Sequence, residues 1–397
     1  GVSQTPSVSI SAAYWATRKP TALIVTGMRD TEIDFSWTDN SGGDCSFIVY
    51  KSTDGVTYAQ DGTTVAGDTT YTATGLTAGT LYYFYVVGVK SGNESDPTNI
   101  YDTRFKITVD TTKAGSAADT FVLPTTEAGY NAYIDWGDGG AEQNITGTPG
   151  NVSHTYAASG TYQIKIRGAF PRIYFNNAGD KVKLISIDNW GNIKWSSFGY
   201  SFYGCSNMNG NWIDCPNMTS ASFSLASMFQ GCTIFNYSVE NFNTSAVTTF
   251  HGMFFNCVAF NKPVPFNTAN ANTLAQMFLG CAVFNQSLAS FNTANVLSLS
   301  QFLNSAASFN QSLAHFNTTK VTDYYRAIRS CRAFKQSLAT FVLGVGITDM
   351  SAMLEGSDIN ATGTTTNYDA TLIAWAAQNP PNSLNFHGGS CRYGEGL

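Results

Sequence analysis

The sequence predicts a mainly β protein, in which two small β-sandwiches are followed by a solenoid of stacked repeats. Two observations lead to this fold class. Over residues 20–170, apolar and polar residues alternate in short runs, and this is the period of half-buried strands. From about residue 200 the chain repeats itself every 24 or 25 residues. Since a unit this short cannot bury its apolar face alone, successive copies must stack.

The composition fits this class and excludes several functions. Only 12% of the 397 residues are charged, and the net charge is -6. Binding to nucleic acid or to an anionic membrane surface requires a basic patch, so neither is expected. The sequence holds no run of 18 or more apolar residues, so no membrane-spanning helix is expected. Uncharged Asn, Ser and Thr keep the surface polar, as in extracellular and virion-surface proteins.

The patterns divide the chain into four parts. Residues 1–19 are a lead or linker, and residues 20–104 and 105–170 are the two sandwiches. Residues 171–397 are the solenoid with a cap at each end.

The first sandwich is predicted from alternating runs that include Ile33 to Trp37 and Tyr82 to Val89. The segments IDFSWTDNSG, FIVYKSTDG and YTATGLTAGTLYYFYVVGV together resemble a fibronectin type III domain. The resemblance implies that Trp37 and Leu76 are buried and that Tyr82 forms the tyrosine corner. It also implies that this domain acts as a spacer.

The second sandwich carries the segments WGDGG and HTYAASGTYQIKI, with Tyr156, Ile164 and Ile166 on the expected inward face. The pair resembles a PKD-type domain, although the Phe usual between Trp and Gly is missing. Asp135 and Asp138 are candidate calcium ligands, because two carboxylates beside glycines can hold this ion. The alternative is that they cap the turn by accepting backbone N–H groups. Calcium is the one cofactor that the sequence suggests.

The repeats predict columns of buried side chains, because stacking turns each apolar position into a ladder. The segments SMFQGCTIFN, GMFFNCVAFN, QMFLGCAVFN, QFLNSAASFN and RAIRSCRAFK align. They predict one ladder of Phe235, Phe260, Phe284, Phe309 and Phe334, which we call the Phe ladder. Four more ladders are predicted, and they run from Val247 to Ile347, from Phe250 to Met350, from Met253 to Met353 and from Phe254 to Leu354.

These repeats resemble the leucine-rich-repeat coils of BspA-like bacterial surface proteins, with Phe and Met where Leu usually stands. The lead-in FPRIYFNN and the closing YDATLIAWAAQ also match that family. The resemblance implies a cap with a short helix at residues 368–378 and a non-catalytic surface protein that presents its repeats for adhesion.

Cysteine and asparagine recur at fixed repeat positions. One position holds Cys205, Cys232, Cys257, Cys281 and Cys331, and Ala306 replaces it once. A residue replaceable by Ala is expected to be an unpaired buried thiol. Cys215 and Cys391 remain candidates for a disulfide, whereas Cys45 has no expected partner. The Asn side chains of the FN and FNT segments are expected to bond the backbone of their own and the next coil.

One repeat differs from the others and supplies the candidate binding residues. They are Asp323, Tyr325, Arg326, Arg329 and Arg332, whereas residues 196–319 contain a single Lys or Arg. Tyr and Arg are enriched in binding hot spots, and basic residues three apart are expected on one side of the coil. A glycan or anionic partner is one interpretation, and a locally charged solvated face is the other.

No motif for catalysis or zinc binding is present, and the four His are scattered, so no catalytic residue and no enzyme activity are predicted. We predict an extracellular, cell-surface or virion-surface protein that recognises a host or cell-surface glycan or protein. One alternative is a phage structural protein, such as a tail fibre, a receptor-binding protein or a capsid-decorating protein. A second is an accessory module of a polysaccharide-degrading enzyme. Homo-oligomers and assembly into a larger surface or virion structure stay open.

Overall fold

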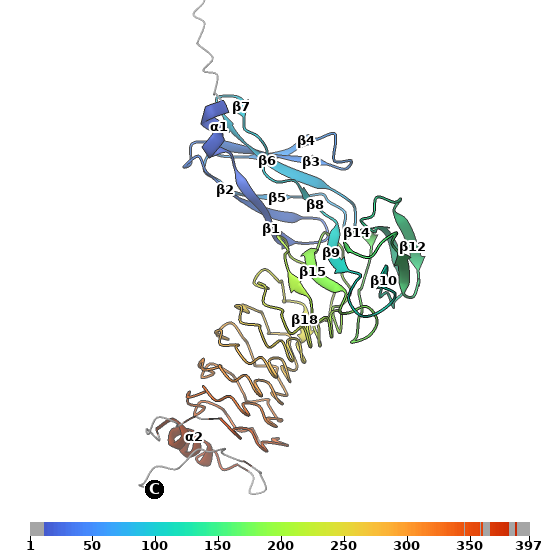
Figure 1. Cartoon of the computed structure of the whole chain (residues 1–397). Coiled ribbons are helices and arrows are strands. Elements are labelled where there is room, and N and C mark those ends of the chain that lie inside the picture. The colour runs from blue at the N-terminus through green and yellow to red at the C-terminus, as the bar shows by residue number, and fades with distance from the viewer. Residues whose placement is uncertain (1–11, 345, 358, 360–365, 381–385, 387–397) are drawn as a thin grey trace, which may run out of the picture.

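The computed structural model describes residues 12–344, 346–357, 359, 366–380 and 386. These residues form two β units at one end of the molecule and a long stack of coils that leads away from them (Figure 1). We call the two β units the first and second sandwich. The coils of residues 196–344 and 346–357 are called the coil stack.

The first sandwich consists of two antiparallel sheets, which follow from the predicted alternation. Their orders are β1-β2-β5 and β4-β3-β6-β7, with β8 paired to β6. Phe35, Trp37, Phe47 and Phe84 fill the core between the sheets. The strands are β1 Thr21–Met28, β2 Ile33–Thr38, β3 Ser46–Ser52, β4 Ala59–Thr64, β5 Thr70–Ala73, β6 Tyr83–Lys90, β7 Asn93–Glu94 and β8 Tyr101–Asp102.

Three features implied by the fibronectin resemblance are present in this sandwich. Trp37 and Leu76 are both buried. The Thr77 N–H donates to the hydroxyl of Tyr82 over 3.2 Å, so Tyr82 makes the bond to upstream backbone that defines a tyrosine corner.

The predicted lead is partly folded onto the first sandwich. Helix α1 (Ala12–Arg18) buries the Trp15 ring in the core of this sandwich. The hydroxyl of Tyr14 lies 3.5 Å from the thiol of Cys45. Residues 12–18 are therefore part of the first folded unit, and not a linker.

The second sandwich has a six-stranded sheet of order β12-β11-β14-β9-β15-β16, packed against the β10-β13 ribbon. Strand β15 pairs with β9, so this sheet continues past residue 170, where the sequence predicts the boundary to the solenoid. The core likewise continues into the coil stack. The strands are β9 Phe105–Asp110, β10 Thr120–Leu123, β11 Tyr130–Asp135, β12 Gln143–Gly147, β13 Val152–Thr155, β14 Thr161–Ala169, β15 Leu184–Asn189 and β16 Asn209–Gly210.

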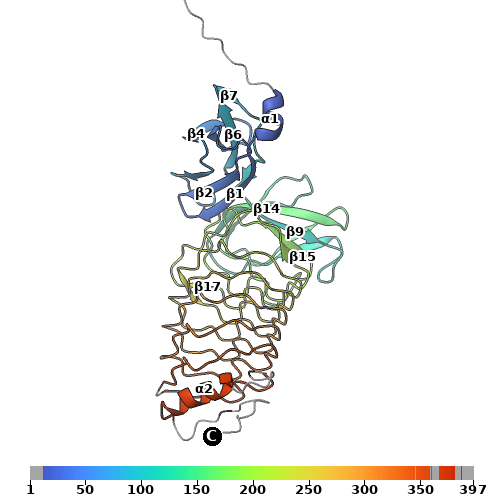
Figure 2. The same ribbon diagram turned by 90° about the vertical axis from the view of Figure 1, so that its left-hand side faces the viewer.

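The coil stack places successive repeats side by side and in parallel, as Figure 2 shows. Strand β17 (Phe223–Ser224) pairs in parallel with β18 (Val247–Thr249). Further parallel bridges join Thr249, Thr273, Ser298, Asp323 and Asp349 in turn. The predicted ladders are confirmed: all their members are buried except Ile347, which is half-buried. In the Phe ladder, neighbouring rings lie 5.7 to 6.2 Å apart and nearly parallel.

Helix α2 (Thr366–Ala376) corresponds to the short helix predicted at residues 368–378. It lies across the far end of the stack in Figure 2. The hydroxyl of Thr371 accepts the N–H of Leu338 over 3.0 Å, and the indole N–H of Trp375 donates to the carbonyl of Leu338 over 3.2 Å. The helix thus satisfies backbone groups that the terminal coils would otherwise leave unpaired.

Asparagine side chains tie the coils together as the sequence predicts. Asn285 Oδ1 accepts the N–H of Asn310 over 2.9 Å and the Nε2–H of Gln311 over 3.0 Å, both from the next coil. The Asn residues of the FNT segments act within their own turn, as Asn292 does toward the N–H of Ala294 over 3.1 Å. Much of the polar composition is therefore used to satisfy the backbone.

The recurring cysteines are buried free thiols, as predicted. The Cys257 Sγ–H donates to the carbonyl of Phe229 in the previous coil over 2.9 Å, and burial raises the pKa of this thiol well above its usual value. Cys45 and Cys215 are also free and buried. Cys391 lies outside the described residues, and since Cys215 is a free thiol, the candidate disulfide between them is not formed in this structure.

A buried carboxylate fixes the first sandwich to the rest of the molecule. Asp214 is 2% exposed and accepts the N–H groups of Trp190 and Gly191, each over 2.8 Å. It also accepts the hydroxyl of Tyr101 from the first sandwich over 2.9 Å. Burial raises the pKa of Asp214 to about 6, against these hydrogen bonds, which favour the ionised form.

A second contact stiffens the same junction. Asp30 of the first sandwich pairs with Lys194 and accepts hydrogen bonds from Asn217 and Thr219 over 3.0 and 2.7 Å. The sandwich is thus held against the first coils by side chains on both partners.

Neither α1 nor α2, the helices in the described part of the chain, has the length and apolar character that crossing a bilayer requires.

Candidate functional site

A ladder of left-handed residues runs along one edge of the coil stack. Each member has a positive φ between 51° and 60°, and in the six members from Tyr200 to Arg326 the N–H donates to a carbonyl of the next coil. The bonds are 2.7 to 3.1 Å long along the ladder. We call this the face ladder, and its members are Tyr200, Ser227, Gly252, Gln276, Gln301, Arg326 and Ala352.

Most positions on the face ladder hold small or flexible residues. Because a left-handed backbone costs a residue with a Cβ atom about 1 kcal/mol or more, Gly252 is the least strained member. The largest side chains are those of Tyr200, the first member, and Arg326, the sixth of the seven. Bulky residues at positive φ are uncommon and often mark functional positions.

Arg326 belongs to what we call the charged coil, the five predicted binding residues Asp323, Tyr325, Arg326, Arg329 and Arg332. The Arg326 guanidinium lies 4.7 Å from the centre of the Tyr325 ring. Asp323 accepts the N–H of Tyr325 over 3.0 Å and the hydroxyl of Ser298 over 3.0 Å. The structure therefore brings Asp323, Tyr325 and Arg326 together, all three half-buried.

The other two predicted residues behave differently. Arg329 forms an ion pair with Glu355 of the next coil over 2.7 Å. Arg332 is exposed. It lies two residues after Ser330, whose left-handed backbone turns the chain. That the basic residues gather on one side of the coil stays a prediction. The compact part of the charged coil consists of Asp323, Tyr325 and Arg326.

The calcium candidates Asp135 and Asp138 are engaged with protein groups. Each accepts a backbone N–H two residues ahead, Asp135 from Gly137 over 2.9 Å and Asp138 from Gly140 over 3.0 Å. Asp138 also bonds the ring of His154 over 2.8 Å, and these contacts hold the pKa of Asp138 below its usual value. This geometry corresponds to the turn-capping alternative.

Within the described ranges, no three His, Cys, Asp or Glu side chains gather in an arrangement that could hold a metal ion. His251 and His315 lie on separate coils. The ring of His315 bonds the carbonyl of Leu288 over 2.8 Å, and burial lowers the pKa of His251.

An aromatic cluster that the sequence analysis missed lies at the other end of the face ladder. The Tyr200 ring is 6.4 Å from the ring of Tyr174 and 6.4 Å from that of Tyr203. Tyr200 is 38% exposed, among the most exposed aromatic residues described. We call Tyr174, Tyr200 and Tyr203 the tyrosine platform.

The tyrosine platform is rigidly supported. The Arg172 guanidinium lies 4.3 Å from the centre of the Tyr174 ring, pairs with Glu127 and donates to the carbonyl of Gly199 over 2.7 Å. Backbone N–H groups of the neighbouring Asn176 and Asn177 donate to the carbonyls of Tyr200 and Tyr203 over 3.1 and 2.9 Å.

The two asparagines add polar groups beside the rings. Both are exposed, and both have a left-handed backbone, at φ 43° and 59°. The density of Tyr and Asn in RIYFNN and FGYSFYG was the available sequence signal. It did not reveal the cluster, because segments 26 residues apart form it.

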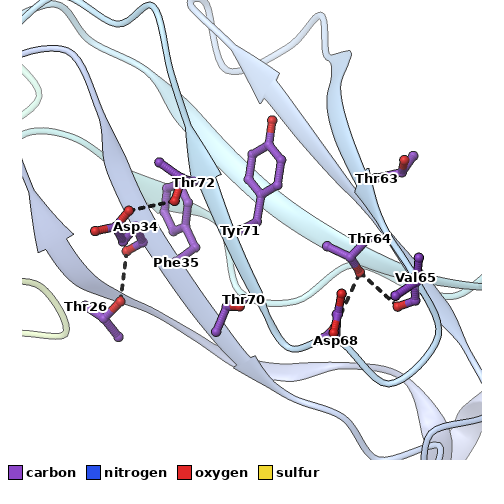
Figure 3. A pocket seen from close by; sticks show the side chains of 10 residues that line it. All are labelled: Thr26, Asp34, Phe35, Thr63, Thr64, Val65, Asp68, Thr70, Tyr71 and Thr72. Carbon is purple, nitrogen blue, oxygen red and sulfur yellow. Dashed lines mark hydrogen bonds between the residues drawn. The ribbon is translucent and has the colours of Figure 1, made fainter.

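A separate pocket of about 640 Å³ lies on the first sandwich, open to solvent and lined mainly by threonines of its open edge (Figure 3). Thr72 donates to Asp34 over 2.7 Å, and Arg29 pairs with the same carboxylate and holds the pKa of Asp34 below its usual value. The pocket thus presents hydroxyls around a carboxylate whose charge is already compensated.

Two family matches agree with this architecture. Residues 18–104 match the fibronectin type III domain. Residues 172–265 and 264–367 match a family described as Mycoplasma protein of unknown function, DUF285. The predicted fibronectin type III domain is thereby confirmed, and the second match fits loosely with the resemblance to BspA-like surface proteins. Both matches fit an extracellular or surface protein.

Two solved structures are similar to part of this chain. An Fn3-like protein from Clostridium thermocellum is 28% identical, with 22% of this chain and 91% of that chain covered, at a TM-score of 0.20. The structure of domains A168-A170 of titin is 23% identical, with 21% of this chain and 30% of that chain covered, at a TM-score of 0.19. The chain thus spans less than a third of the titin fragment. None of the curated proteins matches the sequence.

Proposed function

We propose that this chain is a non-catalytic surface protein that attaches to a glycan or protein partner through the coil stack, with the sandwiches as a rigid base. In this proposal the coil stack is a leucine-rich-repeat-type solenoid and the second sandwich is PKD-like. The parallel bridges at a spacing of 24 to 26 residues support the solenoid assignment.

The observation that carries the proposal is the contrast between the charged coil and its neighbours. At the positions of Asp323, Tyr325 and Arg326, the preceding coil has Ser298, Ser300 and Gln301. The backbone follows the same path in both coils, so the fold does not require the aromatic and charged side chains. Tyr and Arg bind partners well because each combines a large contact surface with polar groups.

The repeat itself supplies a variant that tests this idea. The triple change Asp323→Ser, Tyr325→Ser and Arg326→Gln gives the charged coil the residues of the coil before it. Because those residues already occupy the same backbone path, the variant is expected to keep the wild-type melting temperature. Lys262→Gln, a charge removal elsewhere on the stack, is the matched control.

Attachment of the full chain would be measured on printed microbial and animal glycans and on layers of fibrinogen, laminin and collagen. We expect the wild type and the control to be retained on at least one surface, and the triple variant to bind roughly tenfold more weakly, as for loss of a hot spot. Equal retention of the triple variant would refute a role for the charged coil. Absence of wild-type retention on every surface would refute attachment itself.

A further inference from the structure

We propose that the tyrosine platform is a binding site for a neutral, linear glycan whose chain follows the face ladder toward Tyr325. This inference rests on the proposed function of the coil stack and specifies its ligand. It is carried by the three rings and by the ladder that joins them to the charged coil.

The rings offer the surface that a sugar recognises. A pyranose ring has one face of C–H groups and a rim of hydroxyls, so it packs on an exposed aromatic ring while polar groups nearby bond its rim. Tyr200 supplies such a ring, with Tyr174 and Tyr203 each 6.4 Å away. The exposed Asn176 and Asn177 stand next to them with donors and acceptors for hydroxyls.

The charges at the platform favour an uncharged ligand. The Arg172 guanidinium is already paired with Glu127 and bonded to the Gly199 carbonyl. Its role is to support the Tyr174 ring from 4.3 Å. An anionic group would have to compete with Glu127 for this guanidinium, whereas a neutral sugar leaves the pair intact.

The backbone indicates that Tyr200 is not placed there for folding. It occupies a left-handed position, φ 60°, where all other members of the ladder except Arg326 have a smaller side chain. The ring is nevertheless 38% exposed, so it contributes little to the core. A strained and exposed aromatic residue is expected where its ring contacts a ligand.

The face ladder gives the glycan a path. From Tyr200 to Arg326 there are five steps from coil to coil, and at about 4.8 Å a step these two residues lie about 24 Å apart. Between them the ladder has Ser227, Gly252, Gln276 and Gln301, which are small or able to bond hydroxyls. Tyr325, stacked with Arg326, is then a second aromatic contact for a chain of several sugars.

The test uses the full chain in native gels that contain soluble glucan, xylan, mannan or chitin derivatives, followed by calorimetric titration with oligosaccharides from two to six sugars. Tyr200→Gly removes the ring and relieves the left-handed strain, so it is expected to keep or raise the melting temperature. Tyr133→Ala is the matched control, because Tyr133 has the same 38% exposure as Tyr200 and lies outside the platform. Its ring lies against Arg167 as that of Tyr174 lies against Arg172.

We expect the wild type and Tyr133→Ala to bind at least one of these polysaccharides, with affinity that grows with chain length. Tyr200→Gly should bind about tenfold more weakly or not at all, the effect expected for loss of one aromatic stack. Tyr325→Ser should weaken the binding of six-sugar chains and leave that of two-sugar chains unchanged.

Two results would overturn the inference: wild-type affinity of Tyr200→Gly, or no binding of any polysaccharide by a wild-type chain that still attaches to protein layers. In both cases attachment through the charged coil would stand. If the wild type bound neither polysaccharides nor any other surface, the proposed function would fall together with the inference.

Discussion

The first sandwich and the coil stack satisfy their backbones by different means. In the first sandwich, strands such as β3 and β6 pair over seven residues, so most backbone groups bond each other. In the coil stack only short stretches pair, and side chains such as Asn285 bond the backbone of the next coil. The stack therefore needs Asn, Thr and Ser at fixed places, and this need explains why its surface carries so little charge.

The two regions also differ in how far the effect of a substitution spreads. The core of the first sandwich is a local cluster that includes Trp15 and Cys215, whereas one continuous core joins the second sandwich to the coil stack. A change in one coil is thus transmitted to its neighbours through stacked side chains. On the face ladder the side chain varies from that of Gly252 to that of Tyr200, while the backbone N–H of both bonds the next coil.

The largest expected effect comes from opening the Phe ladder. Phe284 is fully buried and its ring lies 6.0 Å from those of Phe260 and Phe309. Phe284→Ala should lower the free energy of unfolding of the coil stack by about 3 to 5 kcal/mol. Calorimetry should show this loss in the transition of the stack, and Phe35→Ala, the control in the other core, should affect the transition of the first sandwich. A joint shift of both transitions would show that the junction couples the two cores.

A smaller effect is expected from the side chains that satisfy the backbone. Asn285→Ala removes the acceptor for the Asn310 N–H and the Gln311 side chain and should lower the free energy of unfolding by about 2 kcal/mol. Asn292→Ala removes one exposed bond within its own turn and should cost about 0.5 kcal/mol. Urea denaturation of both variants measures the difference, and equal losses would mean that bonds between coils are worth no more than local caps.

An effect smaller than that of Asn285→Ala concerns the junction and depends on pH. Since the folded pKa of Asp214, about 6, lies above the ordinary value of 3.8, the folded state binds the proton more tightly. The resulting stabilisation is complete below the unfolded pKa and is lost as the pH rises through 6. Lowering the pH from 7 to 5 should therefore raise the free energy of unfolding by about 1 kcal/mol.

Urea denaturation at both pH values tests this expectation, with Asp214→Asn as the reference, since its side chain keeps an acceptor and cannot titrate. The gain should be missing in Asp214→Asn. If the wild type and the variant respond equally to pH, other groups cause the dependence and Asp214 is not responsible.

Much of the fold could be predicted because it depends on local periodicity. The alternation at Ile33 to Trp37 predicts which side chains of a strand are buried. The repeated Phe, Cys and Asn positions predict which side chains lie at equivalent places in successive coils. The candidate site was predicted only in part. Tyr325 and Arg326 are sequence neighbours and do meet, whereas Arg329 is drawn to Glu355 of another coil, which the spacing of the basic residues did not indicate.

The sequence by itself determined the strands of the first sandwich, the period of the coils and the identity of the buried ladders, because hydrophobic periodicity acts over a few residues or one repeat. Only the tertiary structure decided which distant segments meet. It added β15 to the sheet of the second sandwich, placed Tyr101 against Asp214, 113 residues away, and assembled Tyr174, Tyr200 and Tyr203 into one platform. Such contacts depend on how whole units pack, and no local pattern encodes that packing.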